Sequence, residues 1–243
     1  MEKQDKIYKT YKKNIKPFKF DKSVTDVFDD MAERSILGYQ EILKLSASLA
    51  ELFIQKDTSF YDLGAATGNT VKAIAPKIKE KNVNICLLDP SRDMINKCMQ
   101  HFQQKRFSNF QFTFICETIE NTFIKDASFV TMNFTLQFIS PQERDNILSK
   151  IHAGMKNGGM LFLSEKIFFN NPLLQKTFTE LHHDFKLNQG YSQLEINQKR
   201  LALEKTLIPD TLSKLKHRLE AAGFSSVSTV YQNLNFASLV AIK

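Results

Sequence analysis

The chain has 243 residues, a formal net charge of +7, and 42% hydrophobic and 24% charged residues. This length suits one large α/β domain with a full core, and the composition is that of a globular protein. No apolar run approaches the ~20 residues that a membrane-spanning helix needs, and the lysine-rich N-terminus lacks the apolar stretch of a secretory signal. The three cysteines are widely spaced and odd in number, which favours reduced thiols in a cytoplasmic protein over disulfides or a zinc site.

The basic charge is concentrated in the first 20 residues. This segment holds seven lysines and two acids, which leaves a net charge of +5 there and only +2 in the remaining chain. We expect residues 1–20 to form a basic arm that is solvated and partly disordered. A contact with RNA phosphates is the alternative, and direct binding of tRNA stays open.

The first half of the chain alternates predicted helices and strands. Apolar residues recur near every 3.6 positions within 21–54, which predicts helix. Predicted strands follow at 58–65, 83–90 and 110–116. Between them lie predicted helices at 69–81, where Pro76 is expected to bend or shorten the helix, and at 91–106, where Ser91 can cap the first turn.

The second half continues this alternation to residue 166. Predicted strands at 127–139 and 160–166 flank a helix. Ser140, Pro141 and Glu143 predict its start through a capping box, and Gly158 and Gly159 predict its end. The segment 170–220 is expected to be largely helical, and 224–243 to form two strands joined by a turn at 232–235.

Strands that alternate with helices predict an α/β fold. We expect a central, mostly parallel seven-stranded sheet with helices on both faces and a C-terminal antiparallel hairpin. The chain contains no internal repeat and no low-complexity linker, so residues 21–243 are expected to form a single domain after the basic arm at 1–20.

Small and polar residues gather after the predicted strands, where ligands bind in open α/β sheets. Gly64 lets the backbone turn and approach a ligand closely, and Asp89, 27 positions after Asp62, can accept hydrogen bonds from both hydroxyls of a ribose. The other candidates at strand ends are Ala65, Ala66, Thr118, Ile119 and Asn133. The Asp-x-Gly-x-x-x-Gly pattern with a distant Asp resembles the class I S-adenosylmethionine (SAM) methyltransferase fold rather than a pyrophosphate-binding loop. The alternative is a plain strand–turn–helix.

Longer stretches extend this resemblance to one family. The chain is similar to carboxy-SAM synthases in "VFDDMAERSILGY", "YDLGAATG", "MNFTLQFI", "LSEK", "HHDFKLNQGYSQLEINQKR" and "FASLVAIK". Amino-methylating enzymes of this fold carry an Asn/Asp-Pro-Pro-aromatic motif where this chain has "NFTLQF", so that class is disfavoured. The match runs from about Phe20 to Lys243, so residues 1–16 are not expected to contribute to ligand binding.

The resemblance implies roles for individual residues. Tyr39 is expected to pack near the methionine part of the ligand, Asn133 near the sulfonium, and Arg200 against a carboxylate. The other implied contacts are Gly64, Ala65, Ala66, Asp89 and Pro90. The family usually has Asp-Ile at the adenine, where this chain has Thr118-Ile119. A neutral contact would weaken binding by about 1 kcal/mol, unless the neighbouring Glu117 substitutes for the missing acid.

In that family, prephenate donates a carboxyl group to the methyl carbon of SAM, which gives carboxy-SAM and phenylpyruvate. An arginine beside the sulfonium repels SAM but can bind the new carboxylate with two hydrogen bonds. Arg200 is therefore the implied catalytic residue, with no dedicated protein base. The resemblance also implies a homodimer, and as functional partner a tRNA carboxymethyltransferase that transfers the carboxymethyl group to a wobble uridine.

Two further polar clusters receive structural interpretations. His182, His183 and Asp184 are adjacent on a helix and point about 100° apart, so no metal site is expected and they shape a lid or an interface. Glu165 and Lys166 are expected to form an ion pair. Two functions stay open beside the synthase: a SAM-dependent methyltransferase acting on tRNA or a small molecule, and a non-catalytic SAM-binding partner.

Overall fold

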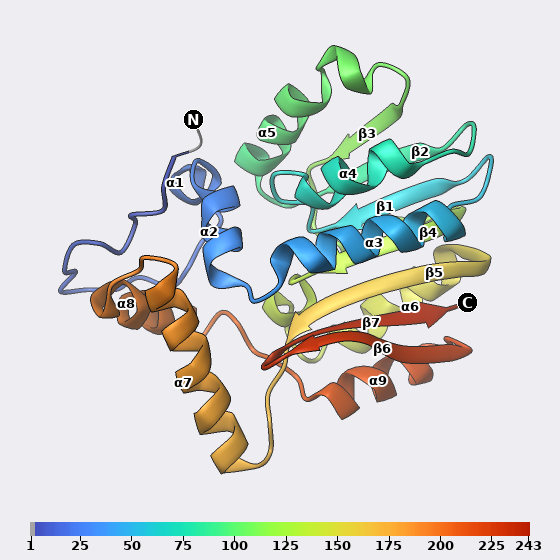
Figure 1. Ribbon diagram of the computed structural model, residues 1–243. Helices are drawn as coiled ribbons and strands as arrows, with labels where there is room; N and C mark the ends of the chain where they lie inside the picture. Colours follow the sequence, from blue (N-terminus) through green and yellow to red (C-terminus); the bar gives the residue numbers. More distant parts are fainter. Residues whose placement is uncertain (1–2) are drawn as a thin grey trace.

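The strands join in one sheet with the order β3-β2-β1-β4-β5-β7-β6 in the computed structural model, which describes residues 3–243 (Figure 1). Neighbours among β1 to β5 are parallel, whereas β7 is antiparallel to both β5 and β6. The bounds are β1 Ser59–Leu63, β2 Asn84–Leu88, β3 Gln111–Ile115, β4 Ala127–Asn133, β5 Met155–Lys166, β6 Ser226–Asn233 and β7 Phe236–Ile242. The predicted fold class is confirmed.

Apolar side chains on both faces of the central strands bury the sheet between two layers of helices. On one face, Phe60 and Phe129 pack with side chains of α3 (Tyr39–Phe53), α4 (Asn69–Ile74) and α5 (Arg92–Phe102). On the other face, Leu63 and Leu161 pack with side chains of α6 (Arg144–Gly154) and α9 (Leu212–Ala221). The carboxyl ends of β1, β2 and β4 are left free of these layers, because no helix of either layer crosses them.

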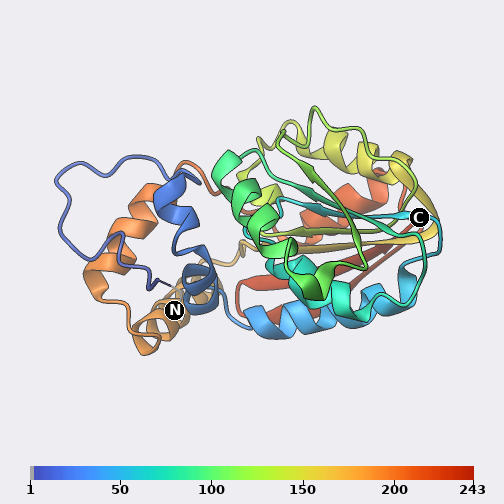
Figure 2. The same ribbon diagram turned by 90° about the horizontal axis from the view of Figure 1, so that it is seen from above.

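A separate group of helices, which we call the helical cap, stands beside the carboxyl ends of the parallel strands (Figures 1 and 2). It comprises residues 3–37 and 168–208. Its helices are α1 Lys22–Thr25, α2 Phe28–Ser35, α7 Pro172–Asn188 and α8 Gln193–Leu203. Tyr8, Phe18, Met31 and Ala202 form part of its own apolar cluster. The cap therefore joins two stretches of chain that lie more than a hundred residues apart in the sequence.

The structure corrects the interpretation of the N-terminal arm. Residues 3–20 pack on the helices of the cap, and Tyr8 and Phe18 are buried there. Gln198 of α8 accepts a hydrogen bond from the Lys12 N–H at 2.6 Å and donates to the Tyr8 and Thr10 carbonyls. Most side chains of this segment are exposed, in agreement with a solvated arm. Tyr8 and Phe18 are buried, however, and pack with Met31 of α2 and Ala202 of α8, so the segment is not a detached leader.

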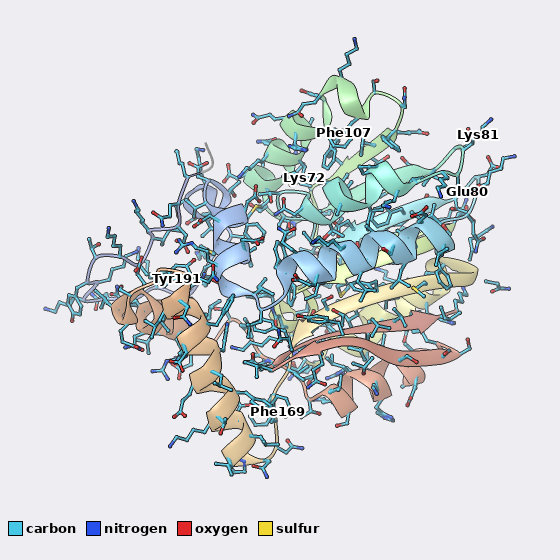
Figure 3. The ribbon with its side chains drawn as sticks, in the orientation of Figure 1. Lys72, Glu80, Lys81, Phe107, Phe169 and Tyr191 are labelled. Carbon is cyan, nitrogen blue, oxygen red and sulfur yellow. The ribbon has the colours of Figure 1, made fainter. Side chains whose placement is uncertain are left out.

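Asp5 fastens the same segment electrostatically. Its buried carboxylate accepts a hydrogen bond from the Tyr191 hydroxyl at 2.8 Å and lies 3.6 Å from the Lys199 ammonium. The Arg34 guanidinium donates to the Asp5 carbonyl and lies 4.0 Å from the centre of the Tyr191 ring, at the start of α8 (Figure 3). The segment that starts at residue 3 is thus part of the folded cap.

Several predicted boundaries move. The helix expected over 21–54 is three helices, α1, α2 and α3. Its break at Gly38 has φ +72°, and an added Cβ there would lie 1.7 Å from the Tyr231 hydroxyl. The helix at 69–81 ends at Ile74 and becomes a short 3-10 turn containing Pro76, as predicted. The strand expected over 127–139 ends at Asn133.

The predicted capping box before α6 does not form. The Ser140 hydroxyl bonds the Gln142 side chain instead, and α6 starts at Arg144 without a side-chain cap. Arg144 is buried and its guanidinium pairs with Asp210 at 2.8 Å, so a tertiary ion pair rather than a cap fixes this helix start. At the other end, α6 stops at Gly154, and the stretch with both predicted terminal glycines belongs to β5.

Candidate active site

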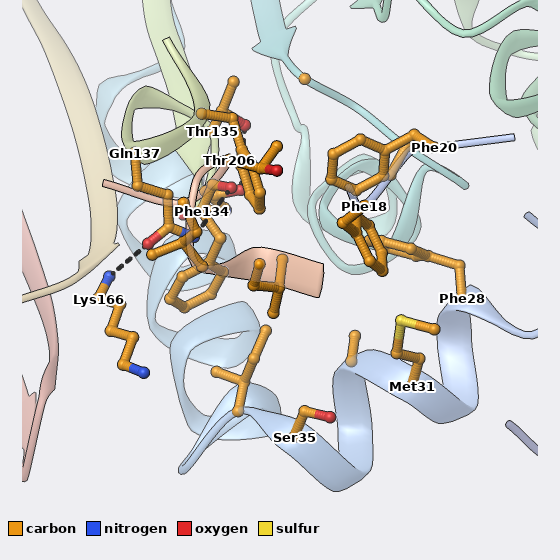
Figure 4. A pocket seen from close by; sticks show the side chains of 18 of the residues that line it. Phe18, Phe20, Phe28, Met31, Ser35, Phe134, Thr135, Gln137, Lys166 and Thr206 are labelled. Atoms are coloured by element: carbon orange, nitrogen blue, oxygen red, sulfur yellow. Dashed lines mark hydrogen bonds between the residues drawn. The ribbon is translucent and has the colours of Figure 1, made fainter. Parts of the chain in front are cut away.

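A cavity of about 520 Å³ lies between the carboxyl ends of the parallel strands and the helical cap, within the range of small-molecule sites. Figure 4 shows Phe18, Phe20 and Phe28 gathered on one side of it, and Phe134, Gln137 and Lys166 on the other. Parallel strands end at the same edge of a sheet, so residues that follow β1, β2 and β4 meet here. Of the predicted site residues, Tyr39, Gly64, Ala65, Ala66, Asp89, Pro90, Thr118, Ile119 and Asn133 all line this cavity.

The loop after β1 is held close to the strand that follows it. The N–H groups of Gly64 and Ala65 both donate to the Leu88 carbonyl, at 2.8 and 2.9 Å. Gly64 has φ +78°, and a Cβ there would lie 2.2 Å from the Thr135 hydroxyl oxygen. Ala66 has φ +47°, an uncommon value for a residue with a side chain. The glycine is thus required at position 64, whereas position 66 accepts a small side chain at some conformational cost.

Asp89 is anchored before any ligand binds. One carboxylate oxygen accepts a hydrogen bond from the Ala66 N–H at 3.0 Å, and the other accepts one from the Ser91 N–H at 2.8 Å. Each oxygen keeps a further lone pair for a ligand hydroxyl. Burial raises the pKa of Asp89 above its ordinary value, against these two hydrogen bonds. Two backbone donors therefore hold the carboxylate in one orientation at the cavity, and the ribose contact stays a prediction.

Asn133 supplies an unused acceptor to the cavity. Its amide nitrogen donates to the Thr70 hydroxyl at 3.1 Å, while its Oδ1 is buried without a hydrogen-bond partner among the described residues. A buried acceptor left unpaired costs about 1–3 kcal/mol unless a ligand satisfies it. Tyr39 lines the cavity nearby, and its hydroxyl accepts a hydrogen bond from Asn69 at 3.3 Å. These two residues form a polar site suited to an ammonium or sulfonium group.

Asp62 is a second buried acid beneath this loop. Its Oδ1 accepts a hydrogen bond from the Thr131 hydroxyl at 2.7 Å, and its Oδ2 has no partner among the described residues. Burial raises the pKa of Asp62 to about 7. A nearby cationic ligand would lower it again, because an opposite charge favours the carboxylate.

The acidic residue beside Thr118 in the cavity is not the one that the sequence analysis considered. Thr118 and Ile119 line the cavity, but Glu117 does not; Glu120, which follows Ile119, does. Glu120 is exposed, so its carboxylate is water-accessible. Glu120, rather than Glu117, is therefore the acid beside Thr118 and Ile119 that lines the cavity.

Arg200 lies away from the cavity formed by this single chain. It is exposed on α8 and is absent from the cavity lining, whereas its neighbour Lys199 is buried and lines it. Residues 199 and 200 point about 100° apart on a helix, and here Lys199 is the one that faces the cavity. The predicted contact between Arg200 and a ligand carboxylate stays a prediction.

Three lysines form a basic wall of the cavity, a role that the sequence did not predict for any of them. Lys166 ends β5, Lys186 lies on α7 and Lys199 on α8. Lys199 donates to the Ser35 hydroxyl at 3.1 Å, and the Ser35 carbonyl accepts from Nε2 of buried His182 at 2.8 Å. The three lysines and His182 lie in the quoted stretches "LSEK" and "HHDFK…QKR", which is the signal that could have identified them.

Burial and the repulsion between neighbouring positive charges lower the pKa values of side chains in and beside this wall. Desolvation lowers the pKa of Lys199 to about 8, against the attraction of Asp5. The pKa of Lys186 is lowered well below its ordinary value by desolvation and then by the charges of Lys166 and Lys199. Desolvation also lowers the pKa of His182 to about 2, with further contributions from Lys186 and Lys166.

The expected ion pair between Glu165 and Lys166 does not form. Glu165 instead accepts hydrogen bonds from the backbone N–H groups of Thr135, Leu136 and Gln137, at 2.8–3.1 Å. Its carboxylate therefore caps the short helical turn after β4, which closes the loop beside the cavity. Burial raises the pKa of Glu165 to about 8, although three N–H donors favour the ionised form.

Within residues 3–243, no group of three or more His, Cys, Asp or Glu side chains is arranged to hold a metal ion. Across that same range, no helix is both long and apolar enough to cross a membrane.

Solved structures with the same fold include SAM-dependent enzymes. An O-methyltransferase family protein from Burkholderia thailandensis matches with a TM-score of 0.64 and 15% identity, over 95% of this chain and 65% of that one. Human N-acetylserotonin methyltransferase, solved in complex with SAM, matches with a TM-score of 0.60 and 14% identity, over 91% of this chain and 55% of that one. These likenesses show the fold.

Sequence relatives are much closer. A family model described as a methyltransferase domain matches residues 61–161. Carboxy-S-adenosyl-L-methionine synthase of Shewanella oneidensis is 42% identical over 240 residues, 99% of this chain and 98% of that protein. The enzyme of the same name from Haemophilus ducreyi is 40% identical over 240 residues, with the same coverage. With these relatives along almost its whole length, the chain belongs to the carboxy-S-adenosyl-L-methionine synthase family.

Proposed function

We propose that this enzyme converts SAM to carboxy-SAM with prephenate as carboxyl donor and phenylpyruvate as the released acid. The observation that carries the proposal is one cavity with both chemical requirements: acceptors at the ends of β1, β2 and β4, and three lysines. SAM is a cation and prephenate a dianion, so a site for both needs the two kinds of side chain. A methyltransferase that binds SAM alone gains nothing from buried lysines near a sulfonium.

The order of the strands sets the direction in which SAM lies. With the ribose on Asp89 after β2, the methionine part crosses the Gly64 loop after β1 and reaches Asn133 after β4. The end of β5, with Lys166, is one strand further. Three strand spacings separate Asp89 from Lys166, roughly 14 Å at about 4.8 Å each. In this proposal the sulfonium lies between Asn133 and the basic wall, with its methyl group toward the lysines.

The proposed reaction balances without a protein base. Prephenate loses its ring carboxyl group as CO2 and its ring hydroxyl as the ring becomes aromatic. The departing hydroxyl takes a proton from the SAM methyl group and leaves as water. The resulting ylide carbon bonds to CO2, which gives the carboxymethyl sulfonium. The enzyme's part is to hold both reactants in line and exclude water that would reprotonate the ylide.

Exclusion of water fits the lining of the cavity. Phe18, Phe20 and Phe138 form an aromatic group in which Phe20 packs edge-on to both others, with ring centres 5.1 Å apart in each pair. The Phe20 carbonyl accepts a hydrogen bond from the Ser91 hydroxyl at 2.7 Å, so the N-terminal segment is tied to the start of α5. The end of this segment therefore covers the cavity.

We also propose a homodimer, in which Arg200 reaches the ligand of a second copy. Support comes from large apolar side chains exposed on α7 and α8: Leu173, Leu174, Leu181, Leu187, Leu194 and Leu201. Arg200 is the neighbour of Leu201 on α8. The Arg200→Ala variant should lose carboxy-SAM affinity by ~3–5 kcal/mol and SAM affinity hardly at all. Arg200→Lys should recover part of the loss, as titration calorimetry would measure.

The resemblance also supports a use for the product. We propose that carboxy-SAM supplies a tRNA carboxymethyltransferase acting on a wobble uridine. Deleting the gene should remove the carboxymethyl group from that nucleoside, and growth with the intact gene should restore it. Persistence of the modification in the deletion strain would contradict this role.

The direct test is a labelled turnover. The protein, stripped of bound ligand, is incubated with SAM and prephenate carrying 13C in its ring carboxyl group. Mass spectrometry should find the label in carboxy-SAM and equal amounts of unlabelled phenylpyruvate. A methylated acceptor without labelled carboxy-SAM would instead support the methyltransferase alternative.

A further inference from the structure

Lys166 and Lys186 are the two cavity cations for which the described residues provide no counter-ion. Across residues 3–243, neither ammonium group lies in an ion pair, whereas Lys199 is 3.6 Å from Asp5. Lys199 also donates to Ser35, so its charge is largely satisfied by the cap. The basic wall therefore contains one lysine paired by the protein and two that face the cavity without a carboxylate.

These two lysines reach the cavity from unrelated parts of the fold. Lys166 is the last residue of β5, and its backbone N–H donates to Gln137 Oε1 at 3.1 Å, which fixes the strand end (Figure 4). Lys186 lies in the last turn of α7, and its carbonyl accepts from the Tyr191 N–H at 3.1 Å, which fixes the turn before α8. The backbones of both are thus held independently, and both side chains converge on one cavity.

Leaving two like charges unpaired and desolvated is costly, because each lowers the other's proton affinity and neither is solvated by bulk water. Both pKa values are in fact lowered from the ordinary lysine value. Apolar side chains at these positions would avoid that cost. An arrangement that raises the energy of the empty protein is expected where an anionic ligand later offsets it.

We propose that Lys166 and Lys186 form the subsite that binds the carboxylate retained by the donor, the 2-oxo acid end of the molecule. This assignment rests on the proposed function and adds to it the residues that recognise the second substrate. Two ammonium groups can each donate a charge-assisted hydrogen bond to one carboxylate. Lys199, held by Asp5 and Ser35, keeps the third charge at the edge of the subsite.

The chemistry decides which of the two donor carboxylates belongs here. The ring carboxylate leaves as neutral CO2, so a lysine that stabilised its charge would bind the reactant more strongly than the transition state and slow the step. The 2-oxo acid carboxylate keeps its charge throughout and is present in the product phenylpyruvate. A charged clamp there positions the donor without opposing decarboxylation.

The test uses Lys166→Met and Lys186→Met, which keep the length of the side chain and remove its charge, together with Lys186→Arg, which keeps the charge. Phenylpyruvate is titrated calorimetrically into each ligand-free protein, and SAM in parallel. Each Met variant should bind phenylpyruvate at least about 10-fold more weakly, while Lys186→Arg should lose less. SAM affinity should stay the same or rise slightly as positive charge is removed.

Steady-state rates give the second readout. In both Met variants, KM for prephenate should rise about 10-fold or more, while kcat at saturating prephenate should stay within about threefold of the wild-type value. The matched control is Lys176→Met, an exposed lysine of the same helix paired with Glu180 at 3.9 Å, which should change neither. Circular dichroism and melting curves show that each variant is folded.

The outcomes separate this inference from the proposed function. A wild-type protein that binds phenylpyruvate but does not convert SAM would contradict the proposed reaction, and the calorimetric arm would still test the subsite. A wild-type protein that turns over prephenate, with Met variants that keep its KM and phenylpyruvate affinity, would overturn the subsite. Loss of carboxy-SAM affinity alone in these variants would likewise overturn it, because the lysines would then hold the new carboxylate of the product.

Discussion

Asp89 and Lys186 line the same cavity from opposite sides and are fixed by different means. Asp89 follows a buried strand, and two backbone N–H groups hold its carboxylate in place. Lys186 is carried by a helix of the cap, and no carboxylate in the described part of the chain pairs with its ammonium group. We call the residues at the ends of β1, β2 and β4, which include Gly64, Asp89 and Asn133, the strand-end wall. There the Asp89 carboxylate is already hydrogen-bonded, although the Asn133 Oδ1 has no partner among the described residues. In the basic wall, the Lys186 ammonium group has no counter-ion in the same part of the chain. The first wall suits tight binding of a cation, and the second suits an anion that enters and leaves.

The largest expected effect comes from removing Asp5, whose carboxylate pairs with Lys199 of the basic wall. Asp5→Ala leaves Lys199 without its counter-ion and Tyr191 without its acceptor. Breaking such a buried pair costs about 3–5 kcal/mol of unfolding free energy, which urea denaturation measures. The control Asp184→Asn alters a carboxylate of α7 that makes no ion pair among the described residues and should cost less than about 0.5 kcal/mol. Equal stability of the two variants would show that the cap does not depend on this pair.

A second prediction tests the strand-end wall. Asp89→Ala should weaken binding of SAM and carboxy-SAM alike by roughly 1.5–3 kcal/mol, because the ribose contact is common to both ligands. Titration calorimetry on ligand-free protein measures both values. A loss confined to one ligand would mean that Asp89 contacts the part in which they differ, and the proposed direction of SAM along the sheet would be wrong.

A third prediction uses the pH dependence that the burial of His182 causes, to which the charges of Lys186 and Lys166 add. His182 has a folded-state pKa near 2, below the ordinary 6.5, so below pH 6.5 the unfolded chain takes up a proton that the folded chain does not. Stability is therefore lost as the pH falls, by about 2 kcal/mol at pH 5. In His182→Gln this component should disappear, so the difference between variant and wild type should change by that amount between pH 7 and pH 5. An unchanged difference would mean that His182 becomes charged in the folded protein.

The smallest expected effect concerns the adenine end. Glu120 lines the cavity two residues after Thr118 and is exposed, so any contact that it makes with the adenine amino group is water-accessible. Glu120→Gln should weaken SAM by about 1 kcal/mol, and Glu117→Gln should leave the affinity unchanged. The opposite result would return the role to Glu117.

The strand-end wall could be predicted from the sequence because it depends on local order. A buried strand followed by small residues or an acid places Gly64, Asp89 and Asn133 at one edge of a parallel sheet, whatever the rest of the chain does. The same reasoning predicts the sheet and its C-terminal hairpin. It fails at the start of α6, where the tertiary pair of Arg144 with Asp210 replaces the predicted local cap.

The basic wall could not be predicted in this way, because it depends on packing between distant segments. Lys166, Lys186 and Lys199 come from a strand end and two helices, and Asp5 reaches Lys199 from the other end of the chain. Lysines also surround Tyr8 and Phe18 in the sequence, so the N-terminal segment has no apolar periodicity from which their burial could be predicted. The resemblance points to Arg200, although its neighbour Lys199 is the residue that faces inward.

The claim that the cavity has two walls for ligands of opposite charge is tested most directly by one crossed titration. Asp89→Ala and Lys186→Met are each titrated with SAM and with phenylpyruvate under the same conditions. Asp89→Ala is expected to weaken SAM and spare phenylpyruvate, and Lys186→Met to weaken phenylpyruvate and spare SAM. If each variant weakened both ligands to the same degree, the two walls would act as one site, and the division of the cavity by charge would be contradicted.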